Sequence, residues 1–582
     1  PWYGTSGTNH LKETEEMPLT VIYPDNFAQD IQKNKAGDIT KTIGYIAYTE
    51  STGDKPFLCA HKRSFITIGS SSIGSQPKDL KRSIEYIKQK YGWDKVRHIL
   101  MADGGSLDNN LVMINYRNLN GQIADLGSEL EVGWWGQYTK SIGDIDEISQ
   151  DTPIRFVSFA LFEKFGEDRK LYDQLSKLTI EPTTVVNQRF LPSITPKPST
   201  ITFVDSPCAT GKTEQLLPAI DGWLSIYPHG KVIDIVHLNA IKDGHQQRLD
   251  ISDYRVGYGQ NDAAINALPK ISICLDSLLR LQLENIPANS LLTLDEMEAI
   301  VRHAAQGNTL GGNAPALQAH LTAIIDRVLV TGGAVIGLED SLTNLSVKGL
   351  LDLTNNQYKY ELIKNEYQPY KWEVAIGSGD NTNFLTTLLE RLKAGENIFL
   401  PTSSQNYGEA VHQLVLKHLP KLADKIHRID AKTAPDLLDL LANPNAWLAE
   451  RDVRLLIGSP TIQSSFNSSN DGQFDRVMAR FANLDTRAHI QMLHRDRSNV
   501  PRDIQILKKG AEVNNRKNAK TLLKSRELIA NKTSLAAGHG RITNNRIGDV
   551  WNRLDAEFSA RDALSAAYLE DYLRCDLAER GH

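Results

Sequence analysis

Hydrophobic residues in the first quarter of the chain fall into short runs separated by polar, helix-compatible stretches. Apolar runs at 43–49, 65–68, 98–101 and 130–135 are rich in β-branched and aromatic residues, which predicts four strands. A helix is expected over 77–91, between the second and third of them. Strands that alternate with helices predict a small doubly wound α/β domain over 43–150, and the polar residues 1–42 predict an irregular lead-in.

A second apolar pattern begins after a proline-rich linker. A helical piece is expected over 154–178, and four prolines between 182 and 198 mark the linker, so 151–199 divides the chain. Strand and helix patterns then recur over 200–370 and 371–506, and a helical, basic region occupies 507–582. The chain is therefore predicted to be a multi-domain α/β protein.

Composition limits the number of domains and the classes of protein that fit this chain. The 582 residues suit about three to four domains, and a hydrophobic content of 41% fills several cores. The net charge of −5 shows no global basic field, and four widely spaced cysteines without a C-x-x-C pair argue against zinc modules and disulfide frameworks. We expect a cytoplasmic protein that does not contact a membrane, since the chain shows no signal peptide or membrane-length apolar run. A start at Pro1 suggests a piece of a longer or processed polypeptide.

The residues with the clearest chemistry follow the apolar run 201–204. There a loop ends in Gly-Lys-Thr and leads into a helix-compatible stretch, the arrangement of a phosphate-binding loop. Its candidate ATP ligands are Ser206, Pro207, Cys208, Ala209, Thr210, Gly211, Lys212 and Thr213, and the Thr213 hydroxyl would also hold Mg²⁺. A bare G-K-[ST] arises by chance roughly 0.3 times in such a chain, and Ser206 replaces the first glycine of the full pattern. The alternative is an ordinary turn with an exposed lysine.

An acidic pair follows another apolar run about eighty residues later. Asp295 and Glu296 end the segment 290–296. A nucleotide loop needs one carboxylate for Mg²⁺ and one group that orients the attacking water. We assign Asp295 to the metal and Glu296 to the water; surface acids at a strand end are the alternative.

From these motifs onward the order of segments resembles that of superfamily 2 helicases. Strands followed by polar loops recur at 231–239, 271–278, 334–342, 397–405 and 455–464. The resemblance implies two RecA-like lobes, coupling of hydrolysis to domain movement near Asp340 and Ser341, and DNA contacts. The implied DNA-binding residues are His237, Ser277, Ser403, Ser404 and Ser464.

The last segment of this series is rich in arginine. Gln491 and Arg495 lie four apart, which places them on one face of a helix. An arginine that enters the ATP site from the second lobe neutralises transition-state charge, an effect of about 10³–10⁵ in rate. Arg495 is the first candidate and Arg497 the second, although His494 stands where the family has glycine. A solvated arginine-rich turn is the alternative.

Acidic residues near the ends of the first strands form another candidate site. Glu50, Asp103, Asp144 and Asp146 would converge at one edge of a parallel sheet and bind Mg²⁺, although acids there also serve solubility. The amino-acid sequences of 50–57, 103–105 and 134–147 resemble those of the toprim domain of cyanobacterial plasmid replication proteins. That resemblance implies primase or nicking activity. Ser51 and Gly105 depart from the family pattern, so the domain could instead serve only for binding.

A local basic stretch suggests where DNA would bind. Residues 495–532 hold eleven lysines and arginines and four acids, a local excess of seven positive charges. A solvated helix face is the alternative for any one of them.

The leading hypothesis is an ATP- and Mg²⁺-dependent DNA helicase or translocase that acts in plasmid or phage replication initiation. Its expected partners are single-stranded or forked DNA at a plasmid origin, and host replication proteins. Two alternatives stay open: a toprim nuclease-translocase in defence or repair, and a nucleotide-gated DNA-binding scaffold without turnover.

Overall fold

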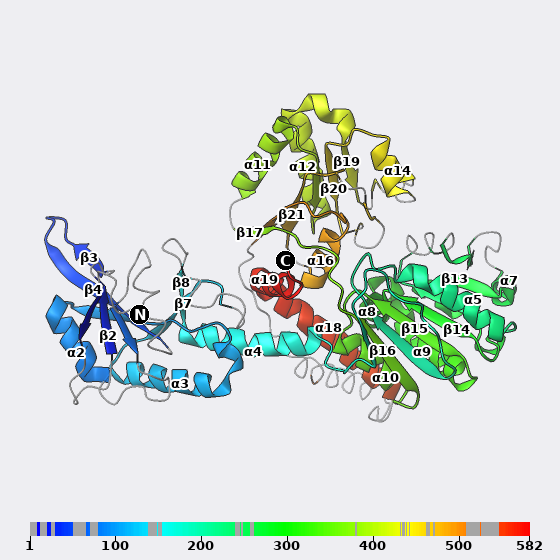
Figure 1. Cartoon of the computed structure of the whole chain (residues 1–582), viewed down its shortest axis with the longest axis horizontal. Coiled ribbons are helices and arrows are strands. Elements are labelled where there is room, and N and C mark those ends of the chain that lie inside the picture. Colours follow the sequence, from blue (N-terminus) through cyan, green and yellow to red (C-terminus); the bar gives the residue numbers. More distant parts are fainter. Residues whose placement is uncertain are drawn as a thin grey trace. The chain divides into compact units, whose positions relative to one another are not determined.

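The chain forms two compact units in the computed structural model, Pro1–Leu171 and Tyr172–His582 (Figure 1). The structure describes residues 8–11, 20–24, 29–49, 66–69, 80–137, 148, 154–238, 245, 248–255, 261–378, 381–430, 432–433, 437, 439–440, 443–460, 462, 466–469, 472–482, 484–507, 524 and 546–582.

The first unit is built on a mixed sheet whose centre is parallel. Its strands run in the order β1-β2-β5-β4-β6-β7-β8, with β3 paired to β4, and only the β5-β4-β6-β7 neighbours are parallel. The strands are β1 (Thr8–Leu11), β2 (Thr20–Pro24), β3 (Gln29–Lys33), β4 (Ile39–Tyr48), β5 (Ile66–Gly69), β6 (Lys95–Leu100), β7 (Leu130–Trp134) and β8 (Arg155–Ser158). The helices are α2 (Leu80–Tyr91), α3 (Asn110–Asp125) and α4 (Phe159–Ser176), which continues into the second unit.

Two expectations for this part of the chain are wrong. The lead-in 1–42 is not irregular throughout, since β1, β2, β3 and the start of β4 lie within it. The piece 154–178 is not wholly helical, because Arg155–Ser158 pairs antiparallel with β7 before α4 begins. The Arg97 guanidinium lies 5.1 Å from the centre of the Phe156 ring. This contact joins two strands, so a local helix pattern does not reveal it.

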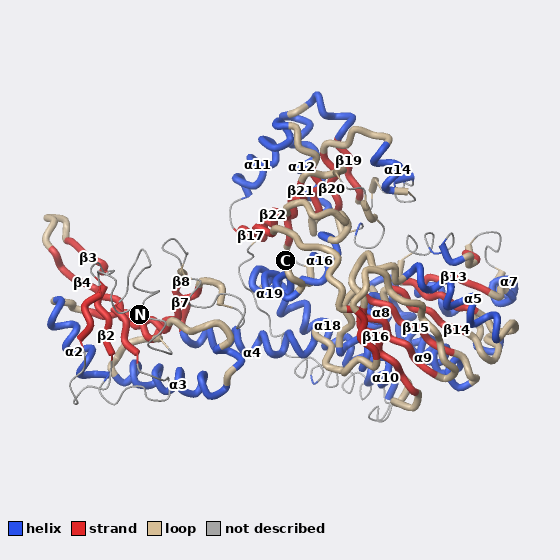
Figure 2. The backbone as a smooth tube through the Cα atoms, in the orientation of Figure 1, coloured by secondary structure: helices blue, strands red, loops and turns tan. Residues whose placement is uncertain are grey.

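The second unit contains a first lobe with a fully parallel sheet. Its order is β12-β13-β11-β14-β15-β10-β16-β9. The five central strands are buried along most of their length. Helices lie beside this sheet (Figure 2). The strands are β9 (Thr184–Val186), β10 (Thr200–Asp205), β11 (Val232–Val236), β12 (Ser252–Asp253), β13 (Lys270–Cys274), β14 (Leu291–Asp295), β15 (Ala334–Glu339) and β16 (Lys359–Asn365). The helices are α5 (Leu216–Ile226), α7 (Asp262–Ala267), α8 (Met297–Gln306), α9 (Ala314–Val330) and α10 (Asn344–Leu353).

The same unit contains a second lobe with another parallel sheet, in the order β17-β22-β21-β18-β20-β19. Its strands are β17 (Val374–Ser378), β18 (Ile398–Pro401), β19 (Ile426–Ile429), β20 (Leu455–Gly458), β21 (Arg476–Phe481) and β22 (Arg502–Ile506). Its helices are α11 (Asn381–Ala394), α12 (Gln405–His418), α14 (Pro444–Ala449) and α16 (Thr486–Leu493), and the chain closes with α18 (Arg546–Ala567) and α19 (Leu569–Glu579).

The predicted multi-domain α/β class with parallel sheets is confirmed. The toprim-like identity of the first unit and the proposed domain boundaries stay predictions. Among the helices that the structure describes, none is long and apolar enough to cross a membrane.

Candidate functional site

The candidate phosphate-binding loop connects β10 to α5 through a short 3₁₀ turn at Thr213–Gln215. Ala209 and Gly211 have left-handed backbone, with φ of 64° and 75°, and these two residues bend the loop. The Lys212 ammonium donates to the Ser206 and Pro207 carbonyls. The lysine therefore lies against the first half of its own loop.

Ser206, which replaces a glycine of the full motif, is fully buried. Its backbone is not left-handed, so the position needs no glycine. The hydroxyl lies 2.6 Å from the Thr210 hydroxyl and accepts a hydrogen bond of 3.1 Å from the Asn365 amide. This serine ties the loop to the end of β16.

The Thr213 hydroxyl donates to Asp295 at 2.7 Å, so the structure brings the two predicted metal ligands together. A hydroxyl and a carboxylate are oxygen donors that suit Mg²⁺. His245 lies 3.2 Å from the same carboxylate oxygen and 3.0 Å from Asp234. Burial lowers the pKa of His245, but the two carboxylates outweigh burial and raise it to about 10, so the ring is cationic at neutral pH. Burial raises the pKa of Asp295, yet His245 and Thr213 leave it below its ordinary value.

Glu296 follows Asp295 in left-handed backbone, with φ of 57°. Burial raises its pKa to about 7, against the opposing charge of Arg495. His237, predicted to contact DNA, lies instead with Nε2 3.7 Å from the Glu296 carboxylate. Burial lowers the pKa of His237 to about 4, which makes the imidazole neutral at pH 7. The acid that we assigned to the attacking water can therefore bind or release a proton near neutral pH.

The arginines come from the second lobe and act on groups of the first. Arg495 is 6% exposed. Burial raises the pKa of Glu296 to about 7 and that of the Cys208 thiol to about 11; the charge of Arg495 opposes both shifts, and Arg497 also opposes the shift of Cys208. The expected helical pairing of Gln491 with Arg495 is wrong, because α16 ends at Leu493. His494 follows the helix directly and turns inward, so that its imidazole ring lies 4.5 Å from the Trp372 ring.

The serines predicted to bind DNA have partners within the chain. Ser277 lies 2.7 Å from the Tyr254 hydroxyl, the Ser403 hydroxyl accepts from the Ala482 amide at 2.7 Å, and Ser404 caps α12. Ser464 lies outside the described residues. Their contacts with nucleic acid stay predictions.

The basic stretch 495–532 is less available than its composition suggested. Arg495 is nearly buried and Arg502 is fully buried, with its guanidinium 3.0 Å from Asp496. Between 508 and 532 the structure describes only Lys524, which is exposed. Two of the eleven cations are thus interior side chains.

Of the four acids predicted to bind Mg²⁺ in the first unit, only Asp103 belongs to the described residues. Glu50, Asp144 and Asp146 lie outside them. Asp103 follows β6, is partly buried, and accepts from the Gly104 amide at 2.8 Å. Gln137 holds this edge together, because its amide donates to the Gly133 carbonyl at 2.7 Å and the Ala102 carbonyl at 3.3 Å. Within the described part of the chain, no group of three or more His, Cys, Asp or Glu side chains is arranged so that it could hold a metal ion.

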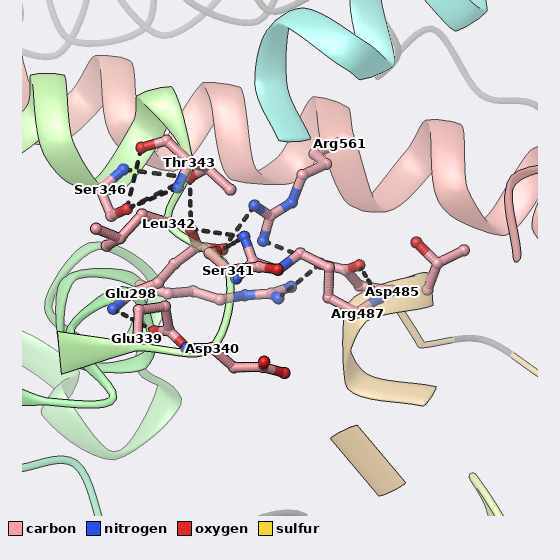
Figure 3. A network of polar contacts seen from close by, with 12 residues as sticks. Glu298, Glu339, Asp340, Ser341, Leu342, Thr343, Ser346, Asp485, Arg487 and Arg561 are labelled. Carbon is pink, nitrogen blue, oxygen red and sulfur yellow. Dashed lines mark hydrogen bonds and ion pairs between the residues drawn. The ribbon is translucent and has the colours of Figure 1, made fainter. Parts of the chain in front are cut away.

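A buried ionic cluster lies beside this site (Figure 3). No sequence pattern identified it. Glu298, three residues after Asp295, binds Arg487 of the second lobe at 2.9 Å and Arg561 of α18 at 2.7 Å. The sequence signal for this cluster was that Glu298 lies close to Asp295 and Glu296 along the chain. The arginines are 189 and 263 residues away along the chain, and no local pattern identifies them.

Solved structures of helicases show a distant likeness to the chain. The DUF1998 helicase MrfA bound to DNA is 13% identical over 61% of this chain and 49% of that chain, with a TM-score of 0.39. Mycobacterium smegmatis helicase Lhr bound to ssDNA and AMP-PNP is 14% identical over 61% and 51%, with a TM-score of 0.40. Mss116p bound to ssRNA and AMP-PNP is 10% identical over 67% and 88%, with a TM-score of 0.38.

The match to MrfA and to Lhr spans about half of the length of each. No family model matches the sequence, and no curated protein does. At these identities and TM-scores function has to be argued from the site itself.

Proposed function

We propose that the chain is an ATP-dependent nucleic-acid motor, a DNA helicase or translocase. One observation carries the proposal. The Thr213 hydroxyl of the loop donates to Asp295 at 2.7 Å, and the charges of Lys212 and of Arg495 from the opposite lobe act on the acidic pair Asp295 and Glu296. Loop, acids and arginine are the groups that phosphoryl transfer requires, and they come from two lobes that can move relative to each other.

Each of these residues has a distinct task in ATP hydrolysis. The Lys212 ammonium binds the β- and γ-phosphates, and Thr213 and Asp295 would hold Mg²⁺, which supplies positive charge beside the phosphates. Glu296 orients the attacking water and accepts its proton, for which a pKa near 7 is well placed. Arg495, with Arg497 beside it, neutralises the charge that develops on the transferred group.

The finer proposal is that the motor acts on DNA in plasmid or phage replication initiation, with a toprim-like first unit. It is supported by the segments 50–57, 103–105 and 134–147 and by the position of Asp103 after β6, in the parallel part of the sheet. The expected partners are single-stranded or forked DNA at a plasmid origin, and host replication proteins.

The experiment is DNA-stimulated ATP hydrolysis and strand unwinding with the wild type and Lys212→Ala. We expect Lys212→Ala to abolish turnover, because the loop loses the cation that meets the phosphates. Lys421→Ala, which removes an exposed lysine from the second lobe, is the matched control and keeps full activity. A wild type that hydrolyses no ATP with any DNA would contradict the motor.

A nucleotide-gated scaffold is the competing function, favoured by Ser206 and His494 at positions where the family has glycine. ATP binding without turnover would support it. The toprim nuclease is tested separately, by metal-dependent nicking in Asp103→Asn and Glu50→Gln. Loss of nicking in these variants, with ATP hydrolysis intact, would support a cutting site in the first unit.

A further inference from the structure

The two C-terminal helices each pack on a different lobe. Helix α18 lies against α8, α9 and α10 of the first lobe. Helix α19 lies against α16 and β17 of the second, and its Leu569, Leu573 and Leu577 belong to the second lobe's hydrophobic core. One residue, Tyr568, separates the helices, with non-helical φ and ψ of −127° and 36°. The helix pair therefore connects the two lobes a second time, independently of the chain between β16 and β17.

A single guanidinium in the C-terminal half of α18 binds an acid from each lobe. Arg561 is 1% exposed and lies 2.7 Å from Glu298 of the first lobe and 2.9 Å from Asp485 of the second (Figure 3). Glu298 is in the first turn of α8, and Asp485 is the N-terminal cap of α16. Arg561 is thus the point where α18 and both lobes meet.

Further charges complete a balanced cluster, which is buried except at Arg302 and Asp562, whose side chains are 32% and 35% exposed. Arg487 of α16 reaches back to Glu298 at 2.9 Å and to the Ser341 carbonyl. Arg302 of α8 binds Asp485 at 3.4 Å and also Asp562, the neighbour of Arg561. Three arginines face three carboxylates, so removal of one partner leaves a charge without compensation in the interior.

This cluster is connected to the phosphate-binding loop by a continuous series of hydrogen bonds. The Glu298 amide donates to Glu339 at 2.9 Å, and Glu339 accepts from the Asp340 amide at 3.0 Å. Asp340 in turn accepts from the Cys208 amide of the loop at 3.0 Å. Glu298 is therefore linked through these hydrogen bonds to the loop, and through three residues of chain to Asp295.

The end of α19 reaches the same place. Arg580, directly after the helix, donates to the Ser341 hydroxyl at 2.7 Å. Arg580, Arg487, Asp340 and Pro207 line a cavity of about 620 Å³ beside the loop. The helix pair thus makes contacts beside the candidate ATP site at two places, Arg561 and Arg580.

We propose that α18 and α19 form a coupling strap of the motor, with Arg561 as the positioning residue that holds Glu298 and Asp485 together when the lobes are closed. The inference rests on the proposed ATPase function and adds a regulatory part to it. Separation of the lobes requires Arg561 to leave one of its two carboxylates and also breaks the Arg487–Glu298 and Arg302–Asp485 ion pairs between the lobes. The closed arrangement is therefore a discrete state rather than one point in a continuous range.

The test compares Arg561→Lys with Arg553→Lys. Lysine keeps the charge but cannot bind two carboxylates at once. Arg553 lies on the same helix and binds Asp352 of the first lobe at 2.6 Å, so it is matched in element and charge but does not reach the second lobe. Rates are measured with saturating DNA, well below the melting temperature of both variants.

We expect the DNA-stimulated kcat of Arg561→Lys to fall by about 10- to 100-fold, the scale of a small misplacement at the reacting centre. Its KM for ATP and its basal rate stay unchanged, and Arg553→Lys behaves as the wild type. A merely structural role would instead lower both rates together with the folded fraction. Asp485→Glu, added to Arg561→Lys, lengthens the carboxylate toward the shorter reach of lysine and restores the stimulated rate.

Three outcomes overturn the strap. They are an unchanged stimulated kcat in Arg561→Lys, an equal loss in Arg553→Lys, and a double variant as slow as Arg561→Lys. In each the wild type is active, so the motor itself stands. A wild type that hydrolyses no ATP overturns the motor, and the strap with it.

Discussion

At the scale of single residues, the candidate ATP site depends on polar side chains buried beneath the phosphate loop. Ser206 bonds to Thr210 and Asn365, and His245 holds Asp234 and Asp295. The loop motif has glycine where this chain has Ser206, and His245 lies outside the motif. Both add hydrogen bonds to buried groups that also have other partners, such as the Pro207 carbonyl for Thr210 and the Ser272 hydroxyl for Asp234.

Restoration of the motif glycine is expected to weaken the loop. Ser206→Gly removes a buried hydroxyl and leaves the Asn365 amide without its 3.1 Å acceptor. Because the position is not left-handed, glycine also gains freedom in the unfolded chain, and the expected loss of stability is about 1–3 kcal/mol. Urea unfolding measures this loss. A variant more stable than the wild type would show that the serine is a tolerated defect.

His245 is expected to act as a positioning residue for Asp295. His245→Ala removes the hydrogen bonds to Asp234 and Asp295 and leaves two buried carboxylates without their shared cation. Loss of such an orienting group lowers metal affinity or activity by about 10- to 100-fold. The measurement is ATP hydrolysis against Mg²⁺ concentration, with the folded state checked by circular dichroism. His229→Ala, at an exposed histidine of the first lobe, is the control, and equal effects of both variants would contradict the role.

At the scale of elements, the first lobe concentrates acids at the ends of three neighbouring parallel strands. Asp205 ends β10, Asp295 ends β14 and Glu339 ends β15. Burial raises the pKa of Asp205 to about 6 and that of Glu339 to about 8. The strand ends are thus crowded with carboxyls, some of which hold a proton at neutral pH.

This crowding predicts a pH dependence of stability. The Glu339 carboxyl has a pKa of about 8 when folded against an ordinary 4.5, so its contribution to stability is present below pH 4.5 and is lost as the pH rises through about 8. Glu339→Gln cannot ionise, and we expect its stability relative to the wild type to increase over that range.

Urea unfolding of both proteins at several pH values between these limits measures the difference. Glu181→Gln, which removes an exposed carboxyl of the same unit, provides the control. A difference that is constant with pH, or that shrinks as the pH rises, would contradict the proton on Glu339.

The sequence predicted those elements whose signal is local. The strands ending at Asp295 and Glu339, the turn before α5 and the central strands of the first unit follow from apolar runs and loop residues. The strand β8 was missed because its pairing with β7 is a tertiary contact. Arg561 and Asp485 were missed for the same reason, since each is an ordinary polar residue on its own helix until both meet Glu298.

At the scale of the whole molecule, the groups assigned to ATP hydrolysis all belong to the second unit. They extend from Ser206 to Arg497, whereas the first unit ends at Leu171. The boundary lies within α4, whose Phe159, Phe162 and Phe165 are buried in the first unit while Tyr172 stacks on Tyr572 at 4.2 Å. Each unit therefore has its own core, which is the requirement for independent folding.

A chain without residues 1–171 is accordingly expected to keep DNA-stimulated ATP hydrolysis at the rate of the full chain. It retains Tyr172 with its contacts to Thr486 and Asp576, and it retains the Arg561 cluster. Steady-state hydrolysis measures the rate, and Lys212→Ala in the shortened chain shows that the activity comes from the loop. A shortened chain that melts cooperatively but has lost turnover would show that the first unit contributes to the ATP site. Retained turnover would assign ATP hydrolysis to the second unit alone and leave the first unit free for a separate task on DNA.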